Sequence, residues 1–380
     1  MHDELVFWFS QPPKVERGAY NEITYLWDNK VYYICLGEWG EDRKKLNWDD
    51  NNYGNAQVIY LNQMGDMDAF IKNFIEEHPT AINIVAGISS AIAKKVYAHC
   101  NDKTRICTVT ERPVPFYTKT GTFYRILRAI LKTVKYSALC RKYRNRIDVL
   151  LPLGQLGVKE YHKVGWPKNR MYPFMYCPEL QMHEPVYHKE EDREIRFLYI
   201  GRFMYSTKGI DYLAKSVKML KGDNWVLDMV GGYGKDRDKI IEWINSEERV
   251  NFKGSWKAEE VVKNIRDYDV VIIPSKGEGW NMIVHEAMAA SVGVICTDLA
   301  VSDEMIAASG AGVVVPAFSA KAICKAMQSV IDNPGLINEW KDKARQYQSR
   351  ITPQDVAQYL AAILDYTYYD GEKPVCPWIN

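Results

Sequence analysis

The chain has 380 residues and a formal net charge of +1, with 47% hydrophobic and 26% charged residues. Its length favours two domains, its composition excludes a disordered chain, and its near-neutral charge gives no case for a nucleic-acid binder. The eight cysteines form no C-x-x-C pair, which argues against a zinc site. Asp3 and Glu4 stand where a signal peptide needs basic residues, and no stretch approaches 18 apolar residues. We therefore expect a cytoplasmic protein, which can still touch a membrane from its inner face.

The first half of the chain alternates short apolar runs with helical patterns. Continuous apolar runs are typical of parallel strands buried on both faces, so an α/β domain is expected. The predicted strands are 5–9, 31–36, 81–85, 105–109 and 148–153, and the predicted helices are 19–28, 90–100 and 123–139. The stretch 37–55 is rich in Trp, Asp and Asn and has no pattern that we can assign.

The predicted helix 123–139 is strongly amphipathic and basic. Its apolar residues recur with the helical period on one face: Phe123, Ile126, Leu127, Ile130, Leu131 and Val134. The surrounding segment 119–146 carries nine Lys or Arg residues and no Asp or Glu. Such a helix either lies on an anionic membrane surface or packs its apolar face into the core and leaves its charges in water.

The stretch 173–194 (PFMYCPELQMHEPVYHKEEDRE) has three prolines, a mixed charge run and no sustained period. It is interpreted as a linker between a first domain, 1–172, and a second domain, 195–352. A last segment, 353–380, begins with a helix that Thr352 caps and that has Pro353 at its first position. The tail VCPWIN has no assignment.

The α/β alternation restarts in the second domain. Strands are predicted at 195–200, 225–230, 250–252, 270–273, 292–296 and 311–315. Helices are predicted from 208 to 220, from 282 to 290, and from 320 and 336 onward. Trp256 follows one of these strands and either stacks on a nucleotide base or packs against the protein.

The loop between the strand 270–273 and the helix 282–290 is the strongest candidate site. A helix N-terminus carries unpaired N–H groups and a partial positive charge, so the amides of Asn281, Met282 and Ile283 are expected to receive a phosphate. Glu278 and Glu286 would repel a phosphate and are expected to accept hydrogen bonds from hydroxyls. Amides that donate hydrogen bonds to a phosphate, next to carboxylates that accept them from hydroxyls, suit a sugar nucleotide as ligand. The alternative is a surface loop with solvated glutamates.

The segment PSKGEGWNMIVHEAMA, in which Glu278 and Glu286 enclose seven residues, resembles the E-x7-E signature of glycosyltransferase family 4. The resemblance implies the GT-B fold, in which two Rossmann-like domains with parallel sheets face a central cleft and the last helix crosses back to the first domain. It also implies a retaining, metal-independent transferase with a nucleoside-diphosphate sugar as donor and no cofactor.

A second stretch, IGRFMYSTKGIDYLAKSV, resembles the first donor-domain motif of the family. There Arg202 and Lys208 would face the diphosphate and stabilise the charge that develops on it as it leaves, with Glu278 as the third catalytic residue. The alternative is two solvated cations. The resemblance places these residues at the donor: Glu286, Gly279, Trp280, Asn281, Met282, Gly201, Gly231 and Gly18.

Two first-domain features allow more than one interpretation. Gly18 stands where the family has a glycine loop facing the cleft, but a simple turn explains it equally well. Many family members carry a histidine in one of the loops after the strands 81–85 and 105–109, and this chain has none there. Glu111 and Arg112 occupy the end of the second of these strands instead. Both are placed on the acceptor side. Glu111 is expected to contact the acceptor or the sugar, and the alternative for Glu111 is an ion pair or a capping role.

The function that the resemblance implies is transfer of a sugar to a glycan or a lipid-linked acceptor in cell-surface polysaccharide assembly. UDP is the nucleotide favoured by its frequency in the family, and GDP or dTDP also fit. Two rivals stay open: a sugar-nucleotide 2-epimerase with the same fold, and an inactive module that only binds the nucleotide sugar.

Overall fold

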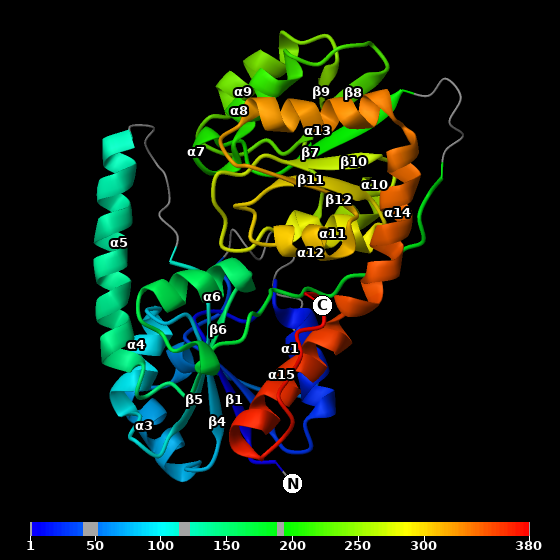
Figure 1. Ribbon diagram of the computed structural model, residues 1–380. Coiled ribbons are helices and arrows are strands. Elements are labelled where there is room, and N and C mark those ends of the chain that lie inside the picture. Colours follow the sequence, from blue (N-terminus) through cyan, green and yellow to red (C-terminus); the bar gives the residue numbers. More distant parts are fainter. Residues whose placement is uncertain (1, 41–51, 114–121, 188–193, 380) are drawn as a thin grey trace.

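The computed structural model describes residues 2–40, 52–113, 122–187 and 194–379, with the side chains of 122–126 left out of that description. These residues form two separate α/β domains, one above the other in Figure 1. Each domain is built on a six-stranded sheet in which every strand pairing is parallel. The predicted α/β class with two parallel sheets is confirmed.

The first sheet has the order β3-β2-β1-β4-β5-β6. Its strands are β1 Leu5–Phe9, β2 Val31–Cys35, β3 Gln57–Tyr60, β4 Ile82–Ala86, β5 Arg105–Thr110 and β6 Val149–Pro152. The second sheet has the order β12-β11-β10-β7-β8-β9. Its strands are β7 Ile195–Ile200, β8 Trp225–Val230, β9 Val250–Phe252, β10 Val270–Ile273, β11 Gly293–Thr297 and β12 Gly312–Val315. Central strands such as β1 and β10 are buried along their whole length, which is why they read as unbroken apolar runs.

Helices lie on both faces of each sheet (Figure 1). In the first domain they are α1 Arg17–Leu26, α3 Met67–Glu77, α4 Ala91–His99, α5 Thr122–Tyr143 and α6 Gly154–Lys163. In the second they are α7 Tyr205–Lys208, α8 Ile210–Val217, α9 Arg237–Asn245, α10 Val261–Ile265, α11 Met282–Ala289, α12 Asp303–Ser309, α13 Ala320–Asp332 and α14 Gly335–Tyr347. The sequence did not predict β3, α3, α6, α7, α9, α10 or α12.

Helix α6 was missed because its glycines were interpreted as punctuation at the end of a domain. Gly154 opens the helix with a positive φ of 65°, and Gly157 lies inside it, where an added Cβ would come within 3.0 Å of Pro152. The glycine at 157 therefore serves close packing of the helix on β6. The predicted helix 208–220 is also wrong in one respect, since Gly209 at φ 67° separates α7 from α8.

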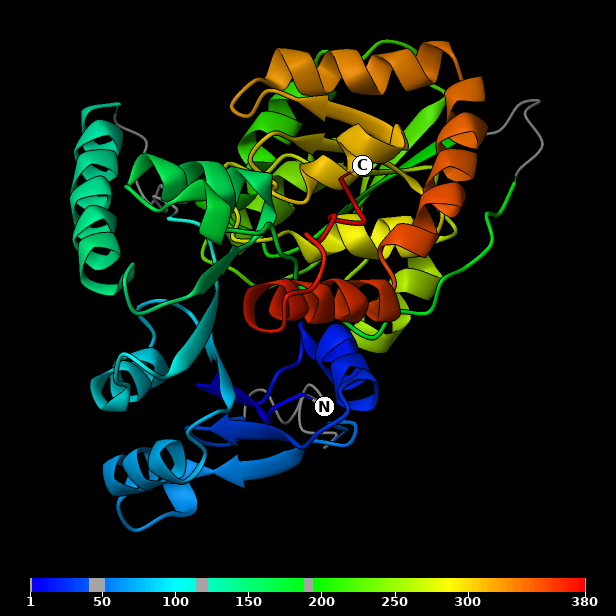
Figure 2. The ribbon, with the colours of Figure 1, turned by 60° about the horizontal axis from the view of Figure 1, so that its bottom comes forward.

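The last helix, α15 Pro353–Tyr368, lies against α1 of the first domain (Figure 2). Its predicted cap is confirmed: the Thr352 hydroxyl accepts a hydrogen bond of 3.1 Å from the amide of Asp355. The stretch expected to be a linker begins as part of the core, because Phe174 and Met175 are fully buried. Phe174 also bridges to Leu153 at the end of β6.

The C-terminal tail is held against the second domain by Trp378, which is fully buried. Its indole Nε1 donates to Glu304 on α12 at 2.8 Å, and its ring meets Tyr359 on α15 edge to face with centroids 5.2 Å apart. Glu304 also accepts a 2.6 Å hydrogen bond from the amide of Gln155 on α6. One carboxylate therefore joins the tail, α12 and the first domain.

We expect Trp378→Ala to lower the free energy of unfolding by about 3–5 kcal/mol, because it empties a buried indole site and removes the indole donor from Glu304 Oε1. Denaturant unfolding followed by circular dichroism measures this. Val375→Ala is the control in the same tail, since Val375 is 68% exposed. Equal losses in the two variants would contradict a role for the indole.

Among the described residues, no helix is long and apolar enough to cross a membrane.

Candidate active site

Glu278 lies at the carboxyl end of β10, in the loop that leads to α11. Although a carboxylate, it is only 9% exposed. It accepts hydrogen bonds of 2.7 Å from Lys208 Nζ and 2.8 Å from Ser275 Oγ. A buried carboxylate needs such donors, because burying a charge without partners is costly. The structure thus joins two of the predicted catalytic residues, 70 positions apart in sequence, as one ion pair.

The backbone around Gly209 explains how Lys208 reaches Glu278. At Gly209 an added Cβ would lie 1.8 Å from the carbonyl oxygen of Pro274, so only glycine lets α7 and α8 approach the β10 loop this closely. The amide of Lys276 donates to the carbonyl of Thr207 at 2.7 Å and fixes the same approach.

Lys276 is a site residue that sequence reasoning missed. It is buried and pairs through Nζ with Asp211 of α8 at 2.7 Å, which ties the loop to that helix. Its place beside Gly277 in the loop was the only sequence signal, because its partner Asp211 lies 65 residues away.

Arg202 follows β7 and its side chain is exposed. It stands beside the predicted donor glycines: an added Cβ at Gly231, whose φ is 150°, would lie 2.2 Å from the carbonyl oxygen of Gly201. Both glycines therefore bring the ends of β7 and β8 together. Contact of Arg202, Gly201 and Gly231 with a donor stays a prediction.

The N-terminus of α11 differs from the expectation. The amide of Asn281 donates to the carbonyl of Ala300 at 3.2 Å, and the amide of Ile283 donates to the side chain of Asn281 at 3.1 Å. Two of the three amides expected to receive a phosphate are therefore hydrogen-bonded within the protein in this structure, and phosphate binding at this helix end stays a prediction. The bond to Ile283 is an N-cap, in which the side chain of Asn281 closes the first turn of its own helix.

Glu286 lies one turn into α11, as predicted. Its Oε2 is enclosed and has no hydrogen-bond partner among the described residues. Burial raises the pKa of this carboxyl to about 7. The indole Nε1 of Trp280 is likewise enclosed with no partner in the described chain. Unsatisfied buried polar atoms of this kind point to groups that a bound molecule supplies.

Glu111 comes from the first domain and meets the same loop. An added Cβ at Gly279 would lie 2.4 Å from the Glu111 carboxyl carbon, so the carboxylate rests on the glycine. Tyr176 donates to it at 3.2 Å. Burial raises the pKa of Glu111, and the nearby charge of Glu278 raises it further. A predicted acceptor-side residue and the predicted donor loop are thus in contact.

Arg112 borders a cavity of about 320 Å³ at the carboxyl ends of β4 and β5. The arginine is 4% exposed and pairs loosely with Glu160 of α6, with 3.4 Å between Nη2 and Oε1. Its Nε and Nη1 have no partner among the described residues. The cavity is also lined by Lys132 of α5 and by Glu16, whose pKa burial raises to about 7. Arg112 thus forms an ion pair, but the pair uses only part of the guanidinium.

Two other predicted residues have packing roles here. Gly18 lies in the first turn of α1 and not in a loop, and an added Cβ would come within 2.5 Å of the Pro178 carbonyl oxygen. It lets α1 pack closely on the 177–178 segment. Trp256 is partly buried and tilts against Tyr268 with ring centroids 6.0 Å apart. In the described part of the chain, no group of three or more His, Cys, Asp or Glu side chains is placed to hold a metal ion.

Residues 184–347 match the family model of glycosyl transferases group 1. Among curated proteins, the chain is 29% identical over 139 residues to an uncharacterized glycosyltransferase of Methanocaldococcus jannaschii, covering 34% of this chain and 35% of that one. It is 22% identical over 244 residues to a putative colanic acid biosynthesis glycosyltransferase, WcaL, of Escherichia coli, covering 61% and 59%. The chain thus spans about a third to three fifths of the length of these relatives.

Solved structures match over nearly the whole chain. Anabaena HepE in complex with UDP and glucose superposes with a TM-score of 0.69 at 13% identity, covering 96% of this chain and 100% of that one. WaaG, described as a glycosyltransferase involved in lipopolysaccharide biosynthesis, gives 0.61 at 15% identity with the same coverage. At such identities the likeness is one of fold, and the fold is GT-B.

Proposed function

Because residues 184–347 match the family model of glycosyl transferases group 1 and the chain has the GT-B fold, we propose that this protein is a retaining glycosyltransferase. It moves a sugar from a nucleoside-diphosphate sugar, held by the second domain, to an acceptor held by the first. The observation that carries the proposal is the Lys208–Glu278 pair in the loop whose Gly279 meets Glu111 of the first domain.

The donor half of the reaction follows from charge. As the glycosidic bond breaks, negative charge grows on the diphosphate, and Lys208 with the exposed Arg202 supplies cations for it. Glu278 holds the Lys208 ammonium in place and accepts a hydrogen bond from a hydroxyl of the donor sugar. The enclosed Oε2 of Glu286 accepts a hydrogen bond from another hydroxyl of the nucleotide sugar.

The acceptor half follows from the family mechanism. The acceptor hydroxyl attacks from the face that the diphosphate leaves, and a donor phosphate oxygen takes its proton. This step needs no enzymic base, so the lack of a histidine in the loops after β4 and β5 is tolerated. Glu111, beside the donor loop, binds and orients the acceptor.

We propose an acceptor that carries an anionic group, such as a lipid-linked phosphate. The support is the buried guanidinium of Arg112, since two of its nitrogens lack partners in the described structure. Lys132 of α5 lines the same cavity and adds a second cation. Leaving a buried Arg partly unsatisfied is costly unless a ligand completes it.

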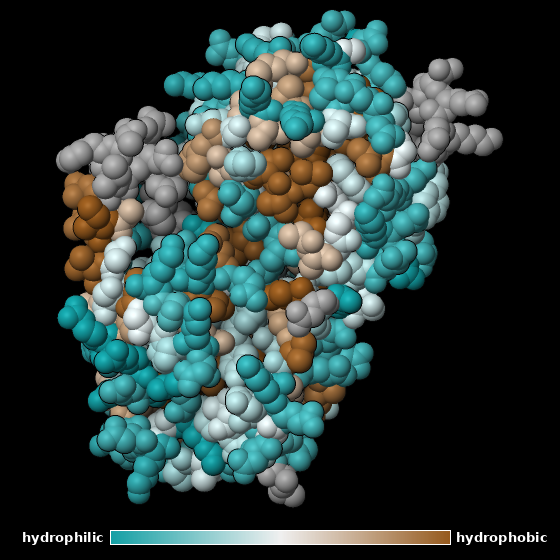
Figure 3. All heavy atoms as spheres, viewed as in Figure 1, coloured by the Kyte–Doolittle hydropathy of each residue, from teal (hydrophilic) through white to brown (hydrophobic). Residues whose placement is uncertain are grey.

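Helix α5 connects that cavity to a membrane surface. Leu127, Ile130, Leu131 and Val134 are between 42% and 60% exposed, so the alternative in which this face joins the core is wrong for these four. Figure 3 has hydrophobic residues along the outer edge of the molecule where α5 stands. The side chains of Phe123, Arg125 and Ile126, and residue Lys119, lie outside the described part. An exposed apolar face flanked by cations fits a helix lying on anionic lipid at the cytoplasmic face.

We expect the protein to co-sediment with anionic liposomes at low salt and not with neutral ones. Changing Lys135, Arg141 and Lys142 to Glu should lower the partition coefficient by at least about 100-fold, since each cation near such a surface contributes about 1 kcal/mol. The control is Lys215, Lys218 and Lys221 changed to Glu, which makes the same charge change on α8 and in the segment that follows it.

Binding should also weaken steeply between about 0.05 and 0.3 M salt, because attraction is screened beyond ~10 Å at 0.1 M. If the parent ignores anionic vesicles at low salt, the membrane proposal fails and a soluble acceptor takes its place.

The donor class is tested by thermal shift with UDP, GDP and dTDP, since a ligand that binds only the folded state raises its apparent stability. UDP is the first choice because HepE was solved with UDP. Donor hydrolysis is then measured with the matching nucleotide sugar, with and without EDTA. Hydrolysis that survives EDTA supports the metal-independent transferase. Isomerised sugar would instead identify a 2-epimerase, and binding without turnover would identify an inactive nucleotide-sugar module.

A further inference from the structure

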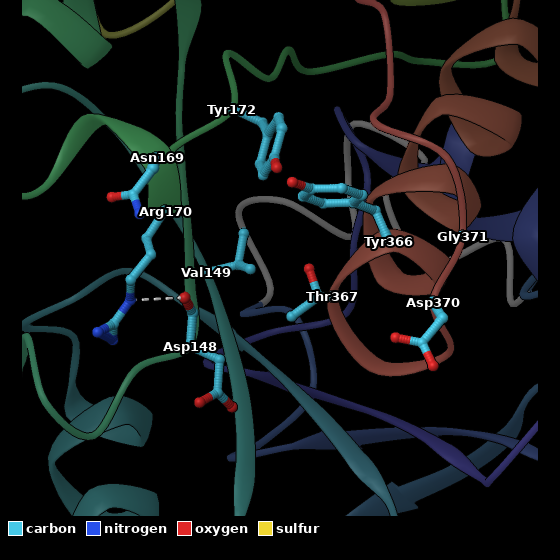
Figure 4. Close-up of a pocket in the computed structure, with 9 residues that line it drawn as sticks. All are labelled: Asp148, Val149, Asn169, Arg170, Tyr172, Tyr366, Thr367, Asp370 and Gly371. Carbon is cyan, nitrogen blue, oxygen red and sulfur yellow. Dashed lines mark hydrogen bonds between the residues drawn. The ribbon is translucent and has the colours of Figure 1, made fainter.

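A groove of about 460 Å³ lies at the amino end of β6, away from the cleft at the carboxyl ends of the strands. One wall comes from the first domain, from Asp148 and the segment 169–172, and the other from the end of α15 and the turn after it (Figure 4). The transfer reaction uses none of these residues.

Two tyrosine rings form one end of the groove. Tyr172 is 8% exposed and Tyr366 is 42% exposed, and the rings meet edge to face with centroids 6.5 Å apart and an interplanar angle of 79°. Figure 4 shows both hydroxyls directed toward the space between the walls. A ring pair of this kind offers an apolar surface and polar tips to the same ligand.

The charges of the groove select against anions. The carboxylates of Asp148 and Asp370 both line it. Among the described lining residues the cation is Arg170, which donates to the backbone carbonyls of Asp148 at 3.1 Å and Arg144 at 2.6 Å and to that of Ile147. Its Nε and Nη2 are therefore bonded within the protein. What the groove offers a ligand is chiefly acceptors, since ionised carboxylates only accept hydrogen bonds.

The wall is rigid and partly strained. Asp148 Oδ2 accepts from the amide of Ile106 at 2.8 Å and from Tyr368 Oη at 2.9 Å, which fixes that carboxylate. Asp370 has a positive φ of 55°, a conformation that costs a non-glycine residue stability and that gathers at ligand sites. The turn is held by a 3.1 Å bond from the amide of Gly371 to the carbonyl of Asp365.

We propose that this groove is a second, non-catalytic binding site for a neutral glycan. A sugar ring has apolar C–H faces that suit the tyrosine rings and many hydroxyl donors that suit Asp148 and Asp370. The volume of the groove is within the range of small-ligand sites. The ligand class rests on the lining alone, whereas its use rests on the proposed function: it would hold part of a glycan chain while the cleft acts on another.

The test is isothermal titration with linear hexasaccharides of glucose, galactose and mannose, on the parent, Tyr366→Ala, Asp370→Ala and Tyr25→Ala. Tyr25 is the control, an exposed tyrosine of α1 outside both sites. We expect at least one hexasaccharide to bind the parent and the control alike. Binding should weaken at least about tenfold in the Tyr366 and Asp370 variants, the loss expected of an aromatic anchor and its hydrogen-bond partner. Donor hydrolysis should be unchanged in all four proteins.

Three results would overturn the proposal: no hexasaccharide binds, all four proteins bind equally, or tetramethylammonium binds the parent in place of the sugars. Equal binding would place the glycan in the cleft, and tetramethylammonium would identify a cation site between the tyrosines. Because titration needs no turnover, a protein without transferase activity leaves this test intact, and the two proposals fail separately.

Discussion

Replacing Lys208 by alanine is expected to lower kcat about 10²–10³-fold, with a smaller change in KM. The reason is that its ammonium matters most when charge has developed on the leaving diphosphate, so the loss falls on the transition state. The change also leaves Glu278, which is nearly buried, with Ser275 as its closest donor. Steady-state kinetics of donor hydrolysis measures both parameters.

The matched control is Lys215→Ala, an exposed lysine on α8, which should leave kcat within about twofold. Arg202→Ala should resemble the Lys208 variant, and Arg202→Lys should not restore activity, because a lysine cannot make the two parallel bonds of a guanidinium. Near-normal turnover in either alanine variant would remove that residue from the catalytic set.

Glu286→Ala is expected to weaken donor binding by about 10–150-fold, the loss of one hydrogen bond to a charged acceptor of about 1.5–3 kcal/mol. Its enclosed Oε2 lacks a partner in the described structure, so the free protein should keep its fold. Titration of the nucleotide sugar measures this. Glu339→Ala, an exposed glutamate of α14, is the control.

The pH dependence of folding stability is a second test of Glu286, made with the variant Glu286→Gln. Burial raises the pKa of Glu286 from 4.5 to about 7, so the folded protein binds more protons than the unfolded chain between these values. Its stability therefore falls as pH rises from 4.5 to 7 and levels above. The Gln variant should lose this part of the slope and melt higher than the parent at pH 8.

Donor affinity of the parent should fall below pH 7, as the carboxyl that accepts the donor hydroxyl becomes protonated. The Gln variant should lack this dependence. A parent whose donor affinity is flat from pH 5 to 8 would remove Glu286 from the donor site.

The elements that the sequence predicted well carry strong local signals. β1 and β10 are buried along their whole length and have unbroken apolar runs, and the start of α15 is marked by the Thr352–Pro353 cap. β3 and α6 were missed because β3 has an exposed or half-buried surface and α6 carries glycines that packing requires. Local pattern cannot distinguish a glycine that ends an element from one that lets it approach a neighbour.

The sequence by itself determined the α/β class, the two sheets and the E-x7-E segment with Glu278 and Glu286, because each depends on residues close together in the chain. Only the tertiary structure decided what those residues touch. Three features join segments 70 or more positions apart: the Lys208–Glu278 pair, the contact of Glu111 with Gly279, and the groove between β6 and α15. Such contacts depend on how the two domains and the last helix pack, and no local propensity encodes that packing.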